Sequence, residues 1–320
     1  MEAFVPLFSN PHLATIAGNF WPRSLDTKGF PVQSRFYSTE PDVQVLVHSQ
    51  APGAPPKAEL LIVHGLEGSS DAGYARSLSQ AALTGGYSVH RFNMRSCGGT
   101  ESVSGKTLYH SGQTCDLLAV AKEIFQQNGR PLILAGFSLG GNVVLKLAGE
   151  LGSDAGGILA GAIAVSTPID LAACARQLDR PENFLYSYRF VDRLKQRIRL
   201  KERITPGSFP LERLRYVRTV YQFDDAFTAP SFGFGSADNY YATQSSNQFL
   251  ERIRVPTLVV QAQDDPLIPF SVYQHPAFRE NPCLTLVTPE HGGHLGFISR
   301  TRPRFWLDPA LMAWIDSLAS

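Results

Sequence analysis

Residues 136–141 read GFSLGG and directly follow an apolar run at 131–135. The pattern sets Ser138 between two glycines, at a spacing that suits a sharp turn from a strand into a helix, because glycine has no Cβ to clash where the backbone doubles back. The Ser138 hydroxyl should then project above the sheet. The next amide, that of Leu139, should begin the helix and point to where an oxyanion would form. The stretch therefore predicts a nucleophile elbow followed by a helix over 139–151.

The composition of the chain indicates its domain class and its expected partners. The chain has 320 residues, 43% of them hydrophobic and 18% charged, which suits one large α/β domain with an insertion. Its formal net charge of +1 gives no reason to expect a polyanionic partner, so nucleic-acid binding is not expected. The N-terminal residues lack the basic region and apolar core of a signal peptide, and no apolar run approaches the roughly 18 residues that span a bilayer. We therefore expect a cytoplasmic protein.

Strand-like and helix-like segments alternate along most of the chain, which favours a mostly parallel sheet with helices on both faces. Apolar segments typical of buried strands lie at 43–48, 60–64, 88–93, 132–137, 162–166, 257–262 and 284–288, and helical patterns lie at 74–83, 114–127, 139–151 and 309–318. The alternation stops between 171 and 250. We interpret this stretch as a helical cap inserted after the sixth sheet strand, with residues 1–170 and 251–320 forming the core domain and 171–250 the cap.

A nucleophilic serine needs a base to accept its proton, and the loop after the last expected strand supplies one. Residues 291–297 read HGGHLGF. We choose His294 as the base, because Leu295 and Phe297 would screen the site and the two glycines allow a close approach; His291 is the weaker candidate. A metal held by the two histidines is not favoured, since no carboxylate lies at a matching offset. No metal and no organic cofactor is expected.

The base in turn needs a carboxylate that orients it. After the penultimate expected strand the sequence reads QDDPLIP over 263–269. We favour Asp265, because the carboxylate that opens such a turn commonly precedes an apolar-apolar-proline segment. Asp264 remains an alternative. Asp170 is a third candidate, which more simply caps the helix that follows it.

The second oxyanion donor should lie in the loop after the strand at 60–64. Residues 64–70 read HGLEGSS, and their glycines would allow backbone N–H groups to turn inward. We choose the Leu66 amide as this donor. His64 is interpreted as a structural histidine rather than a base.

Separate motifs agree in order and spacing with one family. They are HGLEG at 64–68, NMRSCGG at 93–99, GFSLGGN at 136–142, DDP at 264–266 and HGGHLGF at 291–297, with FDDAFTAP at 223–230 in the cap. On these motifs the chain resembles the α/β-hydrolase superfamily and, more narrowly, the branch of bacterial YheT-like hydrolases, plant EMB8-like proteins and the animal ABHD1/2/3 group. The resemblance implies an α/β-hydrolase fold and hydrolysis of carboxylic esters, with medium-chain or acylglycerol-type substrates.

Together these residues predict a serine hydrolase of short- to medium-chain acyl esters or acylglycerols. Ser138, His294 and Asp265 form its expected triad, and the amides of Leu66 and Leu139 form its expected oxyanion hole. Two alternatives stay open: an acyltransferase that passes the acyl group to an alcohol, and a ligand-binding protein that kept the fold without turnover. The expected partner is a small ester or lipid-like molecule.

Three further features have structural interpretations. Arg95 should tie its loop to the protein rather than touch substrate, and Asp224 with Asp225 should hold the cap to the core. Residues 189–203 carry seven basic and two acidic side chains on a helical apolar pattern. This basic amphipathic helix predicts either a solvated cap helix or a lid that transiently meets a lipid surface or an anionic head group.

Overall fold

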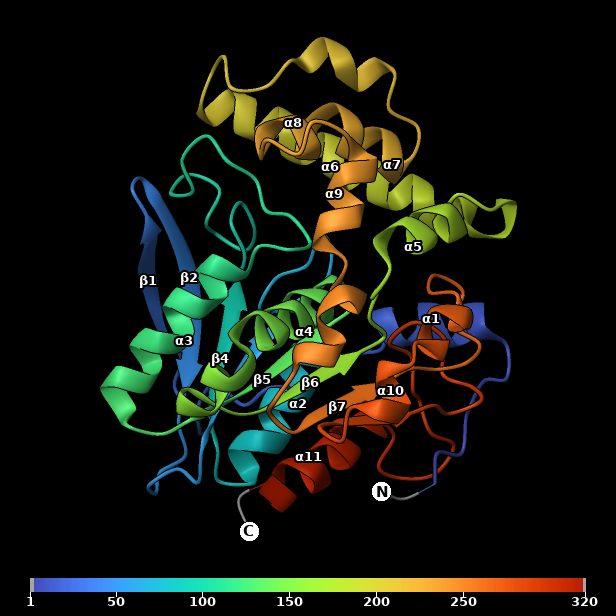
Figure 1. Cartoon of the computed structure of the whole chain (residues 1–320). Coiled ribbons are helices and arrows are strands. Elements are labelled where there is room, and N and C mark those ends of the chain that lie inside the picture. The colour runs from blue at the N-terminus through green and yellow to red at the C-terminus, as the bar shows by residue number, and fades with distance from the viewer. Residues whose placement is uncertain (1–2, 319–320) are drawn as a thin grey trace.

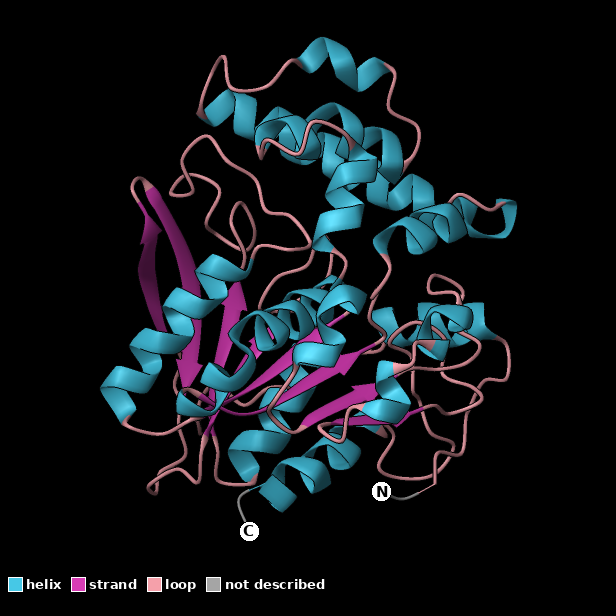
Figure 2. Cartoon of the chain, viewed as in Figure 1, coloured by secondary structure: helices cyan, strands magenta, loops and turns pink. Residues whose placement is uncertain are grey.

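A computed structural model describes residues 3–318, and one eight-stranded sheet runs through it (Figure 1, Figure 2). The strands are β1 (Gln33–Glu40), β2 (Val43–Gln50), β3 (Glu59–Val63), β4 (Ser88–Asn93), β5 (Leu132–Phe137), β6 (Leu159–Val165), β7 (Thr257–Val260) and β8 (Leu284–Val287). Their order in the sheet is β1-β2-β4-β3-β5-β6-β7-β8. The pairs β1–β2 and β2–β4 are antiparallel, whereas all the other pairs are parallel. The expected mostly parallel sheet is confirmed.

The parallel strands end at one edge of the sheet. β3 and β5 are apolar runs that are buried along their whole length, as strands covered on both faces should be. The register pairs Val63 with Gly136 and Val165 with Val260, which brings the ends of β3, β5, β6 and β7 into line. The loops that follow these strands therefore emerge beside one another, where ligands usually bind in parallel sheets.

Helices cover both faces of this sheet. On one face lie α3 (Thr114–Asn128) and α4 (Leu139–Leu151), and on the other lie α2 (Gly73–Thr84) and α11 (Leu307–Leu318). The short helices η1 (Gly152–Gly157), η6 (Phe270–Gln274) and α10 (Ala277–Glu280) join the remaining elements. The four helix segments expected outside the cap are all present, with boundaries within two residues of those predicted.

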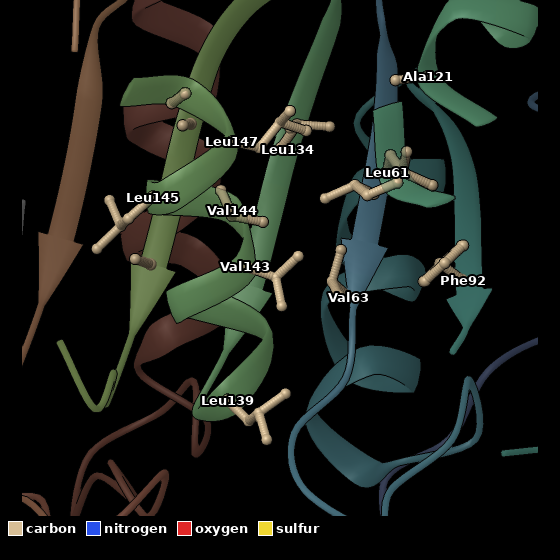
Figure 3. Packing of buried hydrophobic residues seen from close by; sticks show 14 of the residues in the cluster. Leu61, Val63, Phe92, Ala121, Leu134, Leu139, Val143, Val144, Leu145 and Leu147 are labelled. Carbon is tan, nitrogen blue, oxygen red and sulfur yellow. The ribbon is translucent and has the colours of Figure 1, made fainter. Parts of the chain in front are cut away.

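Alternate residues of β3 serve the two faces. Leu61 belongs to the buried cluster that holds Val144 of α4 and Leu134 of β5 (Figure 3). Its neighbour Ile62 belongs to the opposite cluster, together with Leu78 of α2. This alternation follows from the two-residue period of a strand, and it clamps the sheet between two apolar layers.

The chain leaves the sheet after β6 and returns at β7. In between lie α5 (Leu171–Leu178), η2 (Pro181–Asn183), α6 (Phe184–Ile204), η3 (Leu211–Arg215), α7 (Val220–Phe223), η4 (Asp224–Thr228), α8 (Ala229–Ser231), α9 (Ala237–Gln244) and η5 (Ser246–Arg252). Figure 1 shows α5 to α9 standing over the carboxyl ends of the strands. The helices around α6 enclose an apolar cluster of their own, which includes Val191, Ile198 and Phe227. A helical cap after the sixth strand is thus present, and its division from the core at 171–250 stays a prediction.

The strand β1 and the helix α1 (Pro11–Phe20) were not predicted from the sequence, and neither were the short helices η1, η6 and α10. The strand β1 is mostly exposed and pairs only with β2 at the edge of the sheet, so it carries no continuous apolar run. The helix α1 has proline at its first position. Asn10 is its N-cap, and the Asn10 side chain accepts hydrogen bonds from the amides of the first turn. This Asn-Pro pair is a helix-start signal that could have located α1.

Candidate active site

Ser138 lies at the junction of β5 and α4. Its backbone has φ 53° and ψ −124°, a conformation that L-residues rarely adopt. The flanking glycines are required by close approach, because a Cβ at Gly136 would overlap the carbonyl of Gly140, and a Cβ at Gly140 would overlap the carbonyls of Val63 and His64. The strained turn places Ser138 at the edge of the sheet and begins α4 at the next residue.

His294 lies between Ser138 and Asp265. Its Nε2 is 3.0 Å from Ser138 Oγ, and its Nδ1 is 2.9 Å from Asp265 Oδ2. The three side chains come from the loops after β5, β7 and β8, which the parallel register brings to one edge of the sheet. At such distances an imidazole accepts a hydroxyl proton while a carboxylate orients the ring.

Asp265 is buried, and donors hold both of its carboxylate oxygens. The amides of Leu267 and Ile268 donate to Oδ1 at 2.9 and 3.2 Å, and Gln261 Nε2 donates to Oδ2 at 3.1 Å. Hydrogen bonds to an ionised acceptor are among the stronger ones in proteins. They fix the direction of the carboxylate toward His294.

The two other candidate acids do different work. Asp264 accepts a hydrogen bond from the Gly293 amide at 2.8 Å, and its Oδ2 is 3.1 Å from His291 Nδ1, so it braces the histidine loop. Asp170 accepts a hydrogen bond in the first turn of α5 at 2.9 Å, the capping role that its position suggested. In the described part of the chain, neither carboxylate is hydrogen-bonded to His294.

Two hydroxyl groups that the sequence did not single out fix the backbone around His294. Thr15 Oγ1, on α1, accepts from the His294 amide at 2.9 Å, and Ser166 Oγ, after β6, accepts from the Leu295 amide at 3.2 Å. Leu295 and Phe297 have positive φ values of 58° and 36°, which surrounding contacts must hold. No local pattern could have revealed Thr15, because 279 positions separate it from His294.

The two candidate oxyanion donors lie close to the serine. Leu66 and Leu139 both line the cavity that contains Ser138 and His294. Neither N–H donates a hydrogen bond to another described residue. Free N–H groups beside a nucleophile are the chemical requirement of an oxyanion hole.

The residue after Leu66 is held by the cap helix α6. Arg197 donates from Nε and Nη2 to the two carboxylate oxygens of Glu67 at 2.7 and 2.9 Å, and Arg193 Nη1 donates to the Glu67 carbonyl at 3.3 Å. The hydroxyl of Tyr109 accepts from the Glu67 amide at 2.8 Å and donates to Oε1 at 2.9 Å. Glu67 has a φ of 54°, so this buried network holds the loop in a strained conformation.

His64 has the structural environment that was expected for it. The amide of Met94 donates to its Nε2 at 3.2 Å, so its Nδ1 carries the hydrogen and donates to the carbonyl of Gly65 at 2.8 Å. Complete burial lowers the pKa of His64 to about 4. The ring is therefore neutral at physiological pH and fixes the start of the loop.

Two cavities meet at Ser138. The narrower one lies between core and cap and is lined mainly by apolar side chains such as Leu171, Leu178 and Phe223. The wider one is bordered by α1, the loop of Leu66 and α6. Ser138 and His294 line both cavities.

A family model described as alpha/beta hydrolase fold matches residues 59–301. The chain belongs to this family. The match runs from β3 through the histidine loop, so it includes the elbow, both flanking loops and the cap. The fold predicted from the sequence is confirmed.

Relatives of this hydrolase narrow its class. YheT of Escherichia coli (strain K12) is named as an esterase. It is 33% identical to this chain, and the match covers 98% of this chain and 93% of YheT. Phospholipase ABHD3 of Mus musculus is 29% identical over 77% of this chain and 59% of its own length. The Pyrococcus furiosus esterase Pf2001 has a TM-score of 0.64 and 17% identity, covers 93% of this chain and 97% of its own, and shares the fold. The expected branch is confirmed, and so is the expected class, a carboxylic ester hydrolase.

Asp224 and Asp225 of the hydrolase organise the cap itself, which corrects the expectation that they tie cap to core. Asp224 accepts hydrogen bonds from Thr228 Oγ1 at 2.6 Å and from the Tyr241 hydroxyl at 2.7 Å, and Asp225 accepts one from the Ala237 amide at 3.0 Å. All three donors belong to the cap. Burial raises the pKa of Asp224 to about 6, and its side chain borders the narrower cavity.

Arg95 ties its loop to the core, as its position suggested. Its Nε and Nη2 donate to the Asp116 carboxylate at 2.5 and 2.7 Å, and its Nη1 donates to Glu40 at 3.0 Å. Glu40, Cys115 and Asp116 are the one group within residues 3–318 whose ligand atoms have metal-like spacing. The Arg95 guanidinium already supplies the positive charge there, so we assign no metal to this group.

The predicted basic helix is the main part of α6. Its apolar residues Val191, Leu194 and Ile198 are buried in the cluster of the cap, which explains their helical spacing. Among the described residues, no helix combines the length and apolar character needed to cross a bilayer.

Proposed function

We propose that this hydrolase is a serine esterase that cleaves carboxylic esters through an acyl-enzyme formed on Ser138. One observation carries the proposal: the hydrogen-bonded series from Ser138 Oγ to His294 Nε2 at 3.0 Å and from His294 Nδ1 to Asp265 Oδ2 at 2.9 Å. A serine hydroxyl is a weak nucleophile until an adjacent base accepts its proton. The series supplies that base and the acid that orients it.

The reaction begins when Ser138 Oγ attacks the ester carbonyl and His294 Nε2 takes the hydroxyl proton. The N–H groups of Leu66 and Leu139 bind the negative oxygen of the tetrahedral intermediate. His294 then returns the proton to the departing alcohol oxygen, which leaves the acyl group on Ser138. Water attacks this acyl-enzyme with the same histidine as base, releases the acid and restores the serine. Asp265 stabilises the imidazolium in both halves.

The substrates that we propose are short- to medium-chain acyl esters or acylglycerols. The narrower cavity supports this choice, since its lining beside Ser138 is mainly apolar and suits a flexible acyl chain. The wider cavity would hold the alcohol part and give water access to the acyl-enzyme.

A series of p-nitrophenyl esters from acetyl to palmitoyl tests the proposal, with wild type and Ser138→Ala measured in parallel. Ser138→Ala should lose about three to six orders of magnitude in kcat, because the members of a triad act as a unit. A fluorophosphonate should label the wild type and leave Ser138→Ala unlabelled. Full activity in Ser138→Ala would refute the mechanism, and ester products formed with added glycerol would indicate acyl transfer.

A further inference from the structure

Exposed apolar and basic side chains form a patch on α1 and on the start of α6, two helices that border the wider cavity. On α1 and the residue after it, Leu13, Ile16, Phe20 and Trp21 are exposed. They repeat at helical spacing, so they form one face of this helix. Apart from His12, α1 contains no ionisable side chain. A helix face of this kind in contact with water alone is an exception in a folded domain.

The first turns of α6 carry the second half of the patch. Phe184, Leu185 and Tyr188 are exposed there. The two halves together hold seven of the thirteen large hydrophobic side chains that are exposed in residues 3–318, each between 37% and 73% accessible. Single exposed apolar residues are ordinary, but a concentration on two adjacent elements marks an interaction surface.

Direct contacts join α1 to α6. His12 Nδ1 lies 3.2 Å from the hydroxyl of Tyr186, and the two rings stack. The guanidinium of Arg189 lies over the ring of Phe20, 5.2 Å from its centroid. The wider cavity is lined by Ile16 and Phe20 from one helix and by Tyr186, Arg189 and Arg193 from the other. We call the patch on these two helices the rim, because both helices border the wider cavity, which Ser138 also lines.

Arg189 and Arg193 give this rim positive charge, whereas Asp71, which lines the same cavity, is paired with Arg91. Arg189 and Arg193 are exposed and form no ion pair with any described carboxylate. Partial burial and then repulsion from Arg193 lower the pKa of Arg189. The neighbouring acid on α6, Asp192, accepts a hydrogen bond from Gln196 at 2.7 Å.

Arg193 donates to the Glu67 carbonyl and Arg189 lies over Phe20, but neither has a carboxylate partner among the described residues. Guanidinium groups beside apolar side chains suit phosphate or carboxylate groups that lie just above hydrocarbon.

We propose that α1 and the first half of α6 dock this hydrolase onto a lipid surface that carries anionic head groups, with the mouth of the wider cavity against the surface. Apolar insertion and basic attraction are the two signals that peripheral anchoring needs together. An ester lipid would then reach Ser138 from the membrane side without crossing open water. The binding part is independent of the proposed function, whereas the catalytic consequence rests on it.

Flotation with vesicles tests the docking directly. Wild type should float with vesicles of phosphatidylcholine and phosphatidylglycerol and much less with phosphatidylcholine alone. Phe184→Ser with Leu185→Ser should lower the partition coefficient about ten-fold. The matched control is Leu211→Ser with Tyr216→Ser, which removes two exposed apolar side chains elsewhere in the cap and should float like wild type.

Two further measurements complete the experiment: vesicle binding by a variant that lacks a basic side chain, and ester hydrolysis by the apolar variant. Arg189→Gln should weaken binding about five-fold on anionic vesicles only, whereas Arg199→Gln, an exposed position on the same helix, should change it far less. The Phe184/Leu185 variant should hydrolyse soluble p-nitrophenyl acetate like wild type and lose activity on a long-chain ester dispersed in anionic vesicles. Ser138→Ala should still float, so an inactive enzyme leaves the binding result readable.

Three outcomes would overturn the proposal. The first is wild type that stays in the aqueous fraction with anionic vesicles, and the second is a control variant that loses as much binding as the rim variant. The third is a wild-type dimer in sedimentation that the rim variant converts to monomer, because the patch would then be a contact between two copies of this chain.

Discussion

The two loops that flank Ser138 are held by different parts of the molecule. The loop at 291–297 is braced by Asp264, Asp265 and Thr15, all of which precede or follow the cap in the chain. The loop at 64–70 is held at Glu67 by the cap helix α6. Core residues thus hold most of the proposed acid-base half, to which the cap adds hydrogen bonds from Gln177 and Asn183 to the Pro266 carbonyl beside Asp265. The proposed oxyanion half is held at Glu67 directly by two arginines of the cap.

This difference has an energetic basis. Glu67 and Arg197 form a buried ion pair whose side chains are 4% and 11% exposed. Such a pair contributes little beyond its desolvation cost while it is intact, but the loss of one partner leaves an uncompensated buried charge. Moving the cap away from the loop would leave Glu67 without its partner, and this free-energy cost couples the cap to the loop. Changes to each half of the site should then have different kinetic signatures.

The largest effect should come from Asp265→Asn, which attacks the acid-base half. Loss of the carboxylate favours the wrong tautomer of His294, and we expect kcat to fall about 10³- to 10⁴-fold with KM nearly unchanged. Steady-state kinetics on a p-nitrophenyl ester measure this. Asp264→Asn is the matched control and should cost less than about ten-fold, because its partners are His291 and the Gly293 amide. Equal losses in the two variants would mean that the acid has been misassigned.

Arg197→Met should disrupt the loop that carries the proposed oxyanion donor Leu66. With Glu67 unpaired, the loop should relax from its strained conformation, and kcat should fall about 10²-fold, the cost of one lost oxyanion donor. Thermal or urea unfolding should show a loss of about 3–5 kcal/mol. Arg199→Met, an exposed change on the same helix, is the control. Unchanged kcat in a destabilised Arg197→Met would separate the cap from catalysis.

A smaller effect is expected from Tyr109→Phe. This change removes the hydroxyl that accepts from the Glu67 amide and donates to its carboxylate, while the ion pair with Arg197 remains. A buried N–H left without a partner costs about 1–3 kcal/mol. We expect a loss of that size in unfolding free energy and a fall of a few-fold in kcat. Wild-type stability in this variant would show that water replaces the hydroxyl.

The smallest effect is a pH dependence within the cap. Because the folded pKa of Asp224 is raised from 3.8 to about 6, the folded state binds this proton more tightly, and stability rises as the pH falls from above 6 toward 3.8. The free energy of unfolding of the wild type should therefore increase between pH 7 and pH 5, and Asp224→Asn should remove about 1 kcal/mol of that increase. Urea titrations of both proteins at the two pH values measure the difference. Parallel pH profiles would show that Asp224 ionises normally.

Much of the core could be predicted from its residues. The strands at 88–93 and 132–137 and the helix at 139–151 have the predicted boundaries, because buried apolar runs and a Gly-x-Ser-x-Gly turn are local signals. The edge strand β1 was missed, since an exposed strand has no such signal. The expectation that Asp224 and Asp225 join cap to core was wrong because the partners of a turn cannot be read from its own sequence.

The sequence by itself determined the candidate nucleophile, base and acid, since each follows a strand in an order that parallel topology brings to one edge. It could not choose firmly between Asp264 and Asp265, which are adjacent. Only the tertiary structure decided that Asp265 contacts His294, that Thr15 on α1 fixes the loop, and that Arg197 holds Glu67 from the cap. The physical reason is that these partners lie 29, 279 and 130 positions apart, so their contacts depend on packing, which leaves no local pattern.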